Sequence, residues 1–381
     1  MQISRVSVQN WKNFQDAEAV LHDRNFLIGP NASGKSNFLD IFRFLREVAT
    51  AGLSTAIENR GGISALRCLA ARRYSDIDCE ITLEDDSGKD VWTYKLVVNQ
   101  DKASRPIVRS ERVLLGEETE PVLDRPDSDD LKDSLRLTQT ALEQVNANRE
   151  FRDIADFLST ISYQHLVPQA VRDPKGFTGI PVRNDPFGRD FLLRVWNTPS
   201  RIRDARLRNI TSALQVAVPS LQELIVEMDQ QGVAHLKGRY QHWRPQGAFQ
   251  NEAQFSDGTL RLLGLLWVLF EGTGPILLEE PELSLHAEVV RHLPSMIERI
   301  NRVRKTRRQM IVSTHSAEML SDPGIAAEEV LWIEVNESGS VIKQANDRER
   351  EMMRKGMTAS EVLLPRSAPK NVKQLLLSIE R

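Results

Sequence analysis

The sequence predicts an α/β fold with a mainly parallel sheet, an antiparallel side sheet and a mixed helical insertion. Three observations lead to this prediction. Short apolar strands alternate with helical patterns toward both ends of the chain. Three strand-like runs over residues 78–115 are separated by polar turns, which is typical of an antiparallel meander. The region between holds helical patterns, an irregular segment and a hairpin.

The first elements follow from hydrophobic spacing. Residues 3–8 alternate between apolar and polar side chains, which predicts a half-buried strand. Residues 25–28 form a short apolar strand that ends at Gly29. From Ser36 onward the apolar residues recur at helical spacing, and Gly52 marks the expected end of that helix. The order is therefore strand, glycine-rich loop, helix.

The middle of the chain changes composition. Residues 117–133 hold eight acidic side chains and two prolines, so we expect a solvated loop or linker there. Helical patterning resumes over residues 131–159 and again over residues 201–217. A hairpin over residues 223–240 is expected to turn at Gly232.

The last third predicts alternating helices and strands. The helix at residues 259–270 is apolar on nearly every face, so we expect it to lie inside a core. A strand at residues 275–278, a helix at 287–303 and strands at 309–313 and 329–335 follow. This alternation is the source of the predicted parallel sheet.

Composition excludes several classes of protein. The 381 residues are 40% apolar and carry 50 Lys and Arg against 53 Asp and Glu, so no chain-wide positive field exists to attract DNA or anionic lipid. Cys68 and Cys79 lack the spacing of a zinc site or a disulfide framework. The chain begins without a signal-like segment and has no apolar run long enough to span a bilayer. We expect a cytoplasmic protein without membrane contact.

The strongest chemical signal is the segment from Gly29 to Ser36, which satisfies GxxxxGK[ST] between a predicted strand and a predicted helix. Glycines let the backbone wrap a polyphosphate so that N–H groups face the anion. Lys35 would neutralise phosphate oxygens, and Ser36 would hold Mg²⁺. The flanking elements make an ordinary glycine turn the weaker interpretation.

A second centre is Glu279 and Glu280, which follow a short apolar strand. Ligands of open α/β sheets bind at the carboxyl ends of the strands. One carboxylate can support Mg²⁺ through water, and the next can accept a proton from an attacking water. Two such residues alone are more often a polar loop, but the phosphate-binding segment favours the functional interpretation.

Two further segments allow two interpretations each. Ser256 and Gly258 begin the buried helix, where Ser256 is either a helix cap or part of an anion site. His315 follows the strand at 309–313 and is either a packing residue or a residue that contacts phosphate. Spacing alone does not decide between these interpretations.

Five segments in this order resemble the RecF/SMC-like branch of ABC-type ATPases, often labelled AAA-family ATPases. They are NWKNF, GPNASGKS, FSDGTLRLL, LLEEPELSLH and VSTHS. The resemblance implies a P-loop NTPase head that binds ATP and Mg²⁺ and forms a head-to-tail homodimer with ATP between the protomers. The nucleotide-binding residues implied are Gly29, Pro30, Asn31, Ala32, Ser33, Gly34, Lys35, Ser36, Asn37, Ser256, Gly258, Lys12 and Asn13.

The resemblance also assigns roles. Glu280 is implied as the catalytic base, and His315 as the switch histidine that senses the γ-phosphate. Ser36 and Glu279 are implied at the metal, where family members usually have Asp instead of Glu279, so weaker Mg²⁺ binding or slow turnover is expected. Gln164, after the strand-like residues 161–163, is the candidate for the family's glutamine loop and a metal contact.

The organisation expected is an ATPase head made of residues 1–115 and 245–345, an insertion at 116–244 and a tail at 346–381. No coiled-coil arm and no acidic nuclease constellation is visible. We therefore expect a regulatory switch for a separately encoded effector, of the kind found in bacterial anti-phage defence. The alternative is a RecF-like DNA-repair ATPase. It rests on two basic clusters: Arg183, Arg189, Arg194, Arg201, Arg203, Arg206 and Arg208; and Arg299, Arg302, Arg304, Lys305, Arg307 and Arg308.

Overall fold

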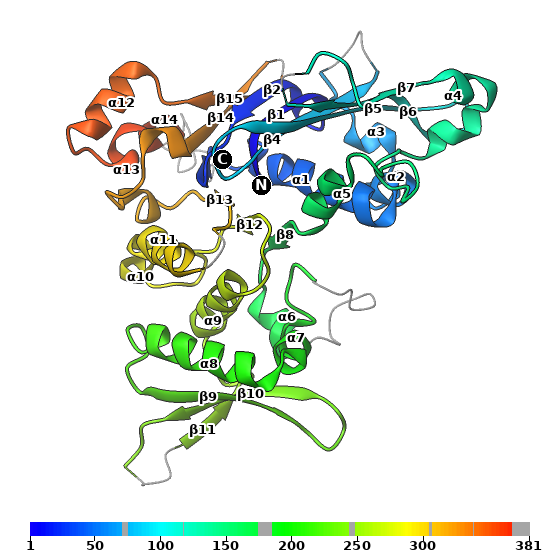
Figure 1. Cartoon of the computed structure of the whole chain (residues 1–381). Helices are drawn as coiled ribbons and strands as arrows, with labels where there is room; N and C mark the ends of the chain where they lie inside the picture. The colour runs from blue at the N-terminus through cyan, green and yellow to red at the C-terminus, as the bar shows by residue number, and fades with distance from the viewer. Residues whose placement is uncertain are drawn as a thin grey trace, which may run out of the picture. The chain divides into compact units, whose positions relative to one another are not determined.

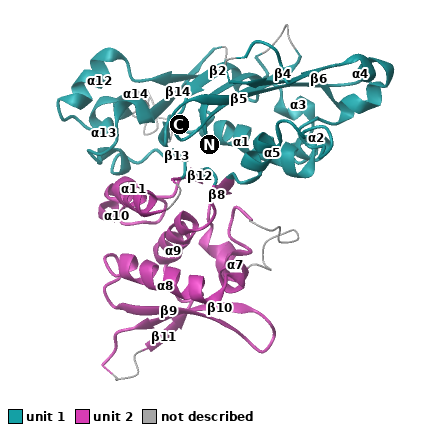
Figure 2. Ribbon diagram, in the orientation of Figure 1, with its two compact units in different colours: residues 1–161, 274–277, 308–381 teal, residues 162–273, 278–307 magenta. Residues whose placement is uncertain are grey.

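The computed structural model describes residues 1–70, 75–116, 118–173, 185–243, 248–304, 307–337 and 339–367. The chain forms two compact units (Figure 2). Unit 1 comprises residues 1–161, 274–277 and 308–381, and unit 2 comprises residues 162–273 and 278–307. These limits differ from the predicted limits of head, insertion and tail, which stay a prediction.

Unit 1 contains a six-stranded antiparallel sheet in the order β2-β1-β4-β5-β6-β7. The predicted meander is confirmed, and the predicted N-terminal strand joins it, because Val8 of β1 lies opposite Cys79 of β4. Alternate residues of β1 are buried, as its pattern predicts. The strands are β1 (Gln2–Trp11), β2 (Phe14–Val20), β4 (Ile77–Glu84), β5 (Asp90–Gln100), β6 (Pro106–Leu115) and β7 (Leu123–Arg125).

A second sheet has the order β15-β14-β3-β13-β12-β8. Its strand β3 is fully buried and pairs in parallel with both β13 and β14, so that Phe26 lies opposite Val312 and Val330. The predicted parallel sheet is confirmed, with β15 antiparallel to β14 at its edge. The strands are β3 (Arg24–Ile28), β8 (Ser162–Gln164), β12 (Ile276–Glu279), β13 (Met310–Ser313), β14 (Val330–Asn336) and β15 (Gly339–Gln344).

Helix α1 (Lys35–Ala51) is the helix predicted after the glycine-rich loop. Its apolar face packs into an aromatic cluster, in which the ring centroids of Trp11 and Phe44 are 5.2 Å apart and those of Phe38 and Phe42 are 5.4 Å apart. Helices α1 and α5 lie along the same side of the antiparallel sheet (Figure 1). Burial of these rings fixes the start of α1, and with it the end of the glycine-rich loop.

Smaller helices complete unit 1. Three of them form the C-terminal part that the structure describes, and residues 368–381 of the predicted tail lie outside it. The helices are α2 (Leu53–Glu58), α3 (Ile63–Leu66), α4 (Ser128–Lys132), α5 (Arg152–Ser159), α12 (Asp347–Arg354), α13 (Ala359–Val362) and α14 (Leu364–Ser367), with short 3₁₀ turns at Ser134–Thr138, Met319–Ser321 and Ala327–Glu329.

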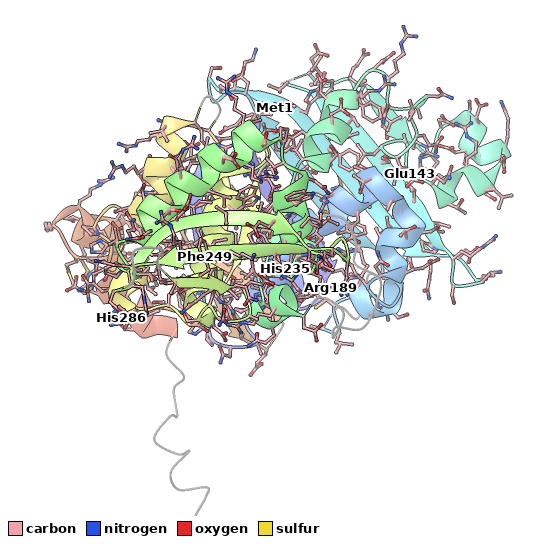
Figure 3. All side chains as sticks on the ribbon, turned by 90° about the horizontal axis from the view of Figure 1, so that it is seen from below. Met1, Glu143, Arg189, His235, Phe249 and His286 are labelled. Carbon is pink, nitrogen blue, oxygen red and sulfur yellow. The ribbon has the colours of Figure 1, made fainter. Side chains whose placement is uncertain are left out.

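Unit 2 places a three-stranded antiparallel sheet, β11-β10-β9, under helix α8 (Figure 1). The predicted hairpin is confirmed, with Gly232 in the left-handed region at φ 78°. The other face of this sheet carries His235 and Phe249 (Figure 3). The elements are α6 (Pro168–Arg172), α7 (Phe191–Asn197), α8 (Ser200–Leu214), β9 (Leu221–Met228), β10 (Ala234–Tyr240) and β11 (Ala248–Asn251).

The core of unit 2 is built around α9 (Asp257–Phe270). Every residue from Leu260 to Leu269 is buried, which confirms the expectation for a helix that is apolar on all sides. Trp267 lies edge-on to Phe191, with ring centroids 6.5 Å apart.

The prediction of one continuous helix over residues 287–303 is wrong. The structure breaks it at His292 into α10 (Ala287–Arg291) and α11 (Leu293–Val303). Pro294 lies in the first turn of α11, where its missing N–H is tolerated; inside a continuous helix it would remove a hydrogen bond.

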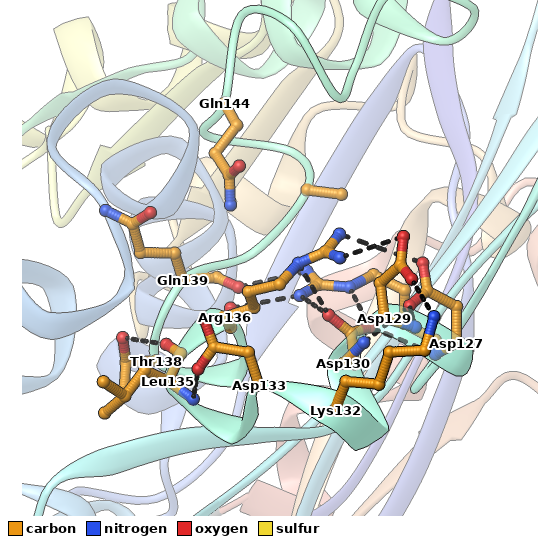
Figure 4. A network of polar contacts seen from close by, with 12 residues as sticks. Asp127, Asp129, Asp130, Lys132, Asp133, Leu135, Arg136, Thr138, Gln139 and Gln144 are labelled. Atoms are coloured by element: carbon orange, nitrogen blue, oxygen red, sulfur yellow. Dashed lines mark hydrogen bonds and ion pairs between the residues drawn. The ribbon is translucent and has the colours of Figure 1, made fainter.

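The acidic segment is largely exposed to solvent, as its composition predicts, but two of its side chains are buried. It folds back on β6 as β7 and α4, and Arg125 and Asp130 are 4% and 1% exposed. Arg125 pairs with Asp130 (Nε to Oδ2, 2.8 Å) and with Glu111 (Nη1 to Oε2, 3.1 Å). Arg136 lies near Asp130 as well and near two further carboxylates of this segment, Asp127 and Asp129 (Figure 4). The buried ion pairs of Arg125 anchor an otherwise exposed acidic segment to the antiparallel sheet.

The same network explains a missing helix. The sequence predicts helix over residues 131–159, but apart from α4 and a 3₁₀ turn the structure has only α5 there. The buried carboxylate of Glu111 accepts hydrogen bonds from the main-chain N–H groups of Ala141 (2.6 Å) and Leu142 (3.0 Å). Those amides are then unavailable to a helix, and burial raises the pKa of Glu111 although its partners oppose the shift.

Candidate nucleotide-binding site

The glycine-rich segment forms a loop between β3 and α1 in unit 1, as its motif predicts. Ala32 and Gly34 have φ values of 62° and 108°, so the chain turns twice through the left-handed region. Such a backbone presents successive N–H groups to one concave side. The N-cap of α1 is Gly34, which offers no side chain to the first amides of the helix. These amides are therefore suited to an external anion.

Lys35 lies across this loop. Its Nζ donates to the carbonyl oxygens of Gly29 (2.9 Å) and Pro30 (3.1 Å), and the residue is 7% exposed. Buried ammonium and uncapped amides together provide positive charge at one loop, which fits a phosphate chain. Among the described residues, Ser33 Oγ is buried without a hydrogen-bond partner.

Asn13 and Lys12 lie in the turn between β1 and β2, and the structure separates their roles. The Nδ2 of Asn13 donates to the carbonyl oxygen of Ser33 (2.8 Å), and its Oδ1 accepts from Asn37 Nδ2 (2.7 Å). Lys12 Nζ instead pairs with Asp40 Oδ2 at 2.7 Å. Asn13 thus contacts the loop directly, and Lys12 contacts the helix behind it.

Asp40, the partner of Lys12, lies at the centre of a cluster of charged side chains. Burial by itself would raise its pKa, but hydrogen bonds and charges from Arg60 and Lys12 outweigh burial and lower the pKa. Arg60 reaches both oxygens of Asp40 and also Glu47. The ionised cluster ties α1 to the turn that carries Asn13.

His315 follows β13 in unit 1. Because β13 runs parallel to β3, both strands end at the same edge of the sheet, where the phosphate-binding loop begins. The main-chain N–H of Thr314 donates to the Leu27 carbonyl oxygen at 3.0 Å, which extends the pairing to the residue before His315. The His315 side chain is exposed. It is therefore accessible to a ligand at that edge.

The two acidic candidates follow Leu278 in unit 2. The hydroxyl of Tyr163 donates to Glu279 Oε2, and Nδ1 of His165 lies 3.2 Å from the Glu279 main-chain oxygen. Glu280 has φ 44°, a left-handed conformation that is rare outside glycine and typically found at functional sites. Sequence reasoning missed Tyr163; its place immediately before Gln164 was the available signal.

Gln164 is 7% exposed and lines a cavity of about 20 Å³ together with Glu279 and Arg261. Arg261 is the basic residue within the apolar run of α9, and its Nε is buried without a hydrogen-bond partner among the described residues. Burial lowers the pKa of Arg261, against the opposing charges of Asp257, Glu282 and Glu280. A lone arginine in an otherwise apolar helix was a signal that sequence reasoning did not use.

Ser256 caps α9, and its Oγ accepts from the Thr259 N–H at 3.1 Å. The cap is one of the two interpretations that the sequence left open. Gly258 approaches the neighbouring loop so closely that a Cβ would lie 2.6 Å from the Ser284 carbonyl oxygen. Asp257 pairs with Arg172 at 2.6 Å (Oδ1 to Nη1). The start of α9 is thus fixed by contacts within unit 2.

Most of the predicted basic clusters contact their own protein. Arg189 pairs with Asp185 at 2.6 Å, and Arg194 with Glu271 at 3.7 Å. Arg304 donates from Nη1 to the Leu269 carbonyl oxygen at 2.6 Å, where it satisfies the end of α9. Arg201, Arg208 and Arg299 are exposed. Arg183 and Lys305 lie outside the described residues.

Membrane-spanning helices and clusters of metal-binding side chains are both absent from the described residues. In the ranges given above, no helix has both the length and the apolar character to cross a membrane. Within the same part of the chain, no group of three or more His, Cys, Asp or Glu is arranged to hold a metal ion.

Comparisons with known proteins bear on the family and the fold. A family described as "AAA domain, putative AbiEii toxin, Type IV TA system" matches residues 24–321, more than half of the chain. The search of curated proteins found no match.

Two solved structures share the fold. The SMC head bound to the C-winged helix domain of ScpA has a TM-score of 0.58 and 13% identity, covering 92% of this chain and 99% of that one. An SMC head with an extended coiled coil, bound to the C-terminal domain of ScpA from Pyrococcus furiosus, has a TM-score of 0.54 and 12% identity. That alignment covers 93% of this chain and 98% of the other. The expected head fold is confirmed.

Proposed function

The chain belongs to the AAA-domain family that matches residues 24–321, and from this premise we propose that it binds and hydrolyses ATP with Mg²⁺. The observation that carries the proposal is the loop between β3 and α1, where a buried Lys35 lies beside helix amides that no N-cap side chain covers. Polyphosphate is the ligand class that this chemistry fits.

Most of the predicted residues have a role in this proposal. Lys35 and the main-chain N–H groups of residues 31–36 hold the phosphates, and Asn13 holds the loop. Ser36 and Glu279 hold Mg²⁺, which would neutralise charge on the phosphates when bound. Glu280 takes the proton of the attacking water, and Gln164 lines the cavity beside Glu279.

The remaining roles belong to a residue at the terminal phosphate and to a residue that positions Glu279. His315, exposed beyond β13, contacts the terminal phosphate. Tyr163 donates to Glu279 and so holds that carboxylate in one orientation. Because glutamate carries one methylene more than the aspartate usual at this position, we expect weaker Mg²⁺ binding or slow turnover, and the measured rate of ATP hydrolysis tests this.

We further propose that two protomers pair head to tail, so that Ser256 and Gly258 of one reach the phosphate bound by the other. Ser256 is exposed at the N-terminus of α9, where the helix dipole favours an anion. The cap contact within one protomer and a phosphate contact in the dimer are compatible, because a hydroxyl both accepts and donates.

The biological role that we propose is an ATP-gated regulatory switch for a separate effector, in bacterial anti-phage defence. The family description, with its toxin and type IV toxin–antitoxin terms, supports a role of this kind. The SMC heads of like fold are bound to domains of ScpA, an association of the kind proposed here.

The test is a pull-down of tagged Glu280→Gln with ATP and Mg²⁺ from its native host, divided into nuclease-treated and untreated halves. We expect a stoichiometric protein partner that survives nuclease. Recovery of DNA alone would contradict the switch and favour the DNA-repair alternative, for which Arg201, Arg208 and Arg299 are among the exposed basic residues. Salt-dependent DNA binding of the ATP-loaded protein is the separate measurement for that alternative.

A further inference from the structure

A serine far from every recognised motif contacts the phosphate-binding loop. Ser340 lies at the start of β15 and is 3% exposed. Its hydroxyl donates to the carbonyl oxygen of Ser33 at 2.6 Å and accepts from Asn13 Nδ2 at 2.6 Å. Its main-chain N–H donates to the Asn13 carbonyl oxygen at 2.7 Å. Ser33, Asn13 and Ser340 therefore form a closed set of hydrogen bonds.

The orientation of the Asn13 amide is determined by its neighbours. Its Nδ2 donates both to the Ser33 carbonyl oxygen and to Ser340, while its Oδ1 accepts from Asn37 on α1. The reversed amide would place one carbonyl oxygen against another. Asn13 thus joins the loop, the helix after it and the β15 hairpin in a single arrangement.

Anchoring one carbonyl oxygen has a direct consequence for the neighbouring donor. The peptide unit is planar and trans, so the Ser33 C=O and the Gly34 N–H point in opposite directions. With the carbonyl held by Asn13 and Ser340, the Gly34 N–H points away from them, to the other side of the loop. Amides of this loop are the groups that bind phosphate.

Two glycines allow these contacts. A Cβ on Gly34 would lie 2.0 Å from Asn13 Nδ2, and a Cβ on Gly339 would lie 2.5 Å from the Asn13 carbonyl oxygen. The hairpin has a second attachment, because Gln344 Nε2 donates to the Val20 carbonyl oxygen at 3.1 Å. The position of Ser340 is thus supported at both ends of β15.

We propose that Ser340 is a positioning residue of the phosphate-binding loop, acting with Asn13 on the Ser33 carbonyl oxygen. Both residues lie outside residues 24–321, so the family match does not include them. The hairpin of β14 and β15 is then part of the nucleotide site. The inference rests on the proposed function, because it takes ATP as the ligand of the loop.

The experiment measures ATP affinity by calorimetry in the full-length Glu280→Gln chain, so that the nucleotide stays intact. Loss of one hydrogen bond to the loop should raise the ATP Kd of Ser340→Ala about fivefold. Ser340→Thr keeps the hydroxyl and should restore most of the affinity. Ser110→Ala on β6, whose side chain has no hydrogen bond to any residue that the structure describes, is the matched control and should bind like the parent.

Two further measurements distinguish a positioning role of Ser340 from a merely structural one. The unfolding temperature of nucleotide-free Ser340→Ala should stay within about 2 °C of the parent. Asn13→Ala should weaken binding at least about tenfold, and the double variant should be no weaker, because both residues act on one carbonyl oxygen.

Two results would overturn the proposal. Unchanged ATP affinity in both Ser340→Ala and Asn13→Ala would show that the loop needs neither contact. Additive losses in the double variant would show that the residues act separately. If the parent chain itself binds no ATP, the proposed function fails too; if the parent binds and the variants match it, only the positioning role fails.

Discussion

Helices α1 and α9 both have a glycine and a serine within two residues of their start, but their first amides are satisfied differently. At α1 the N-cap is Gly34, without a side-chain hydrogen bond. At α9 the N-cap is Ser256, whose hydroxyl accepts from the Thr259 N–H. Both helices are long enough, at 17 and 14 residues, to carry a substantial dipole.

The difference indicates what each helix end is for. An uncapped N-terminus with a buried lysine beside it is suited to an anion, which supports the proposal that α1 is the primary phosphate site. A capped N-terminus is complete within its own chain, so α9 needs no ligand to be stable. In the proposed dimer it takes a phosphate only through its partner protomer.

The largest effect is expected at the α1 end. Lys35→Ala removes the buried ammonium and its charge-assisted contacts with phosphate, so ATP affinity should fall by about a thousandfold. Calorimetric titration with ATP and Mg²⁺ checks this. Lys355→Ala, at the exposed C-cap residue of α12, is the control. ATP binding by Lys35→Ala within threefold of the native chain would remove the distinction drawn between the two helix ends.

Glu280→Gln should lower phosphate release by roughly 100-fold while ATP affinity is kept, since the general base is lost and the binding groups remain. The retained nucleotide should stabilise the dimer. The molar mass, measured by light scattering in the presence of ATP, checks this. Glu288→Gln, an exposed residue of α10, is the matched control. Turnover at the native rate would exclude Glu280 as the base, and a monomer with ATP bound would contradict the head-to-tail arrangement.

Ser256 separates capping from phosphate contact. Ser256→Ala should lower stability by about 1 kcal/mol, because the Thr259 N–H loses its acceptor. Ser256→Asp should keep the cap and the unfolding temperature, yet its negative charge should weaken ATP-dependent dimerisation about tenfold. Thermal unfolding and light scattering are measured on both variants. A dimer that forms normally with aspartate at this position would leave Ser256 as a cap alone.

The smallest effect is a pH dependence confined to unit 2. Hydrogen bonds from His235 to Glu252 (2.7 Å) and then Asp229 (3.3 Å) raise the pKa of His235 above its ordinary value. Its stabilisation is complete below the unfolded pKa and is lost as pH rises through the raised folded pKa.

Between pH 6 and pH 9 the unfolding temperature of the native chain should therefore fall by roughly 2 °C more than that of His235→Gln. ATP affinity, which depends on α1, should not follow the same curve. An identical pH profile in the two proteins would show that the imidazolium contributes nothing.

The predictable part of the fold is the part with strong local patterns. Helix α1, strand β3 and the loop between them follow from apolar spacing and from the residues Gly29 to Ser36. Helix α9 was recognisable because it is apolar on every side. The missing helix lies where a distant group competes, because Glu111 takes the amides of Ala141 and Leu142.

The candidate site divides in the same way. The sequence by itself determined the phosphate-binding loop, the two glutamates at the end of β12 and the turn that carries Asn13, because each is a short motif whose chemistry is local. Only the tertiary structure decided that Ser340 holds the loop, that Tyr163 holds Glu279 and that Lys12 faces Asp40. These contacts join residues that are far apart in the chain, and the spacing within one segment carries no information about which distant side chain packs against it.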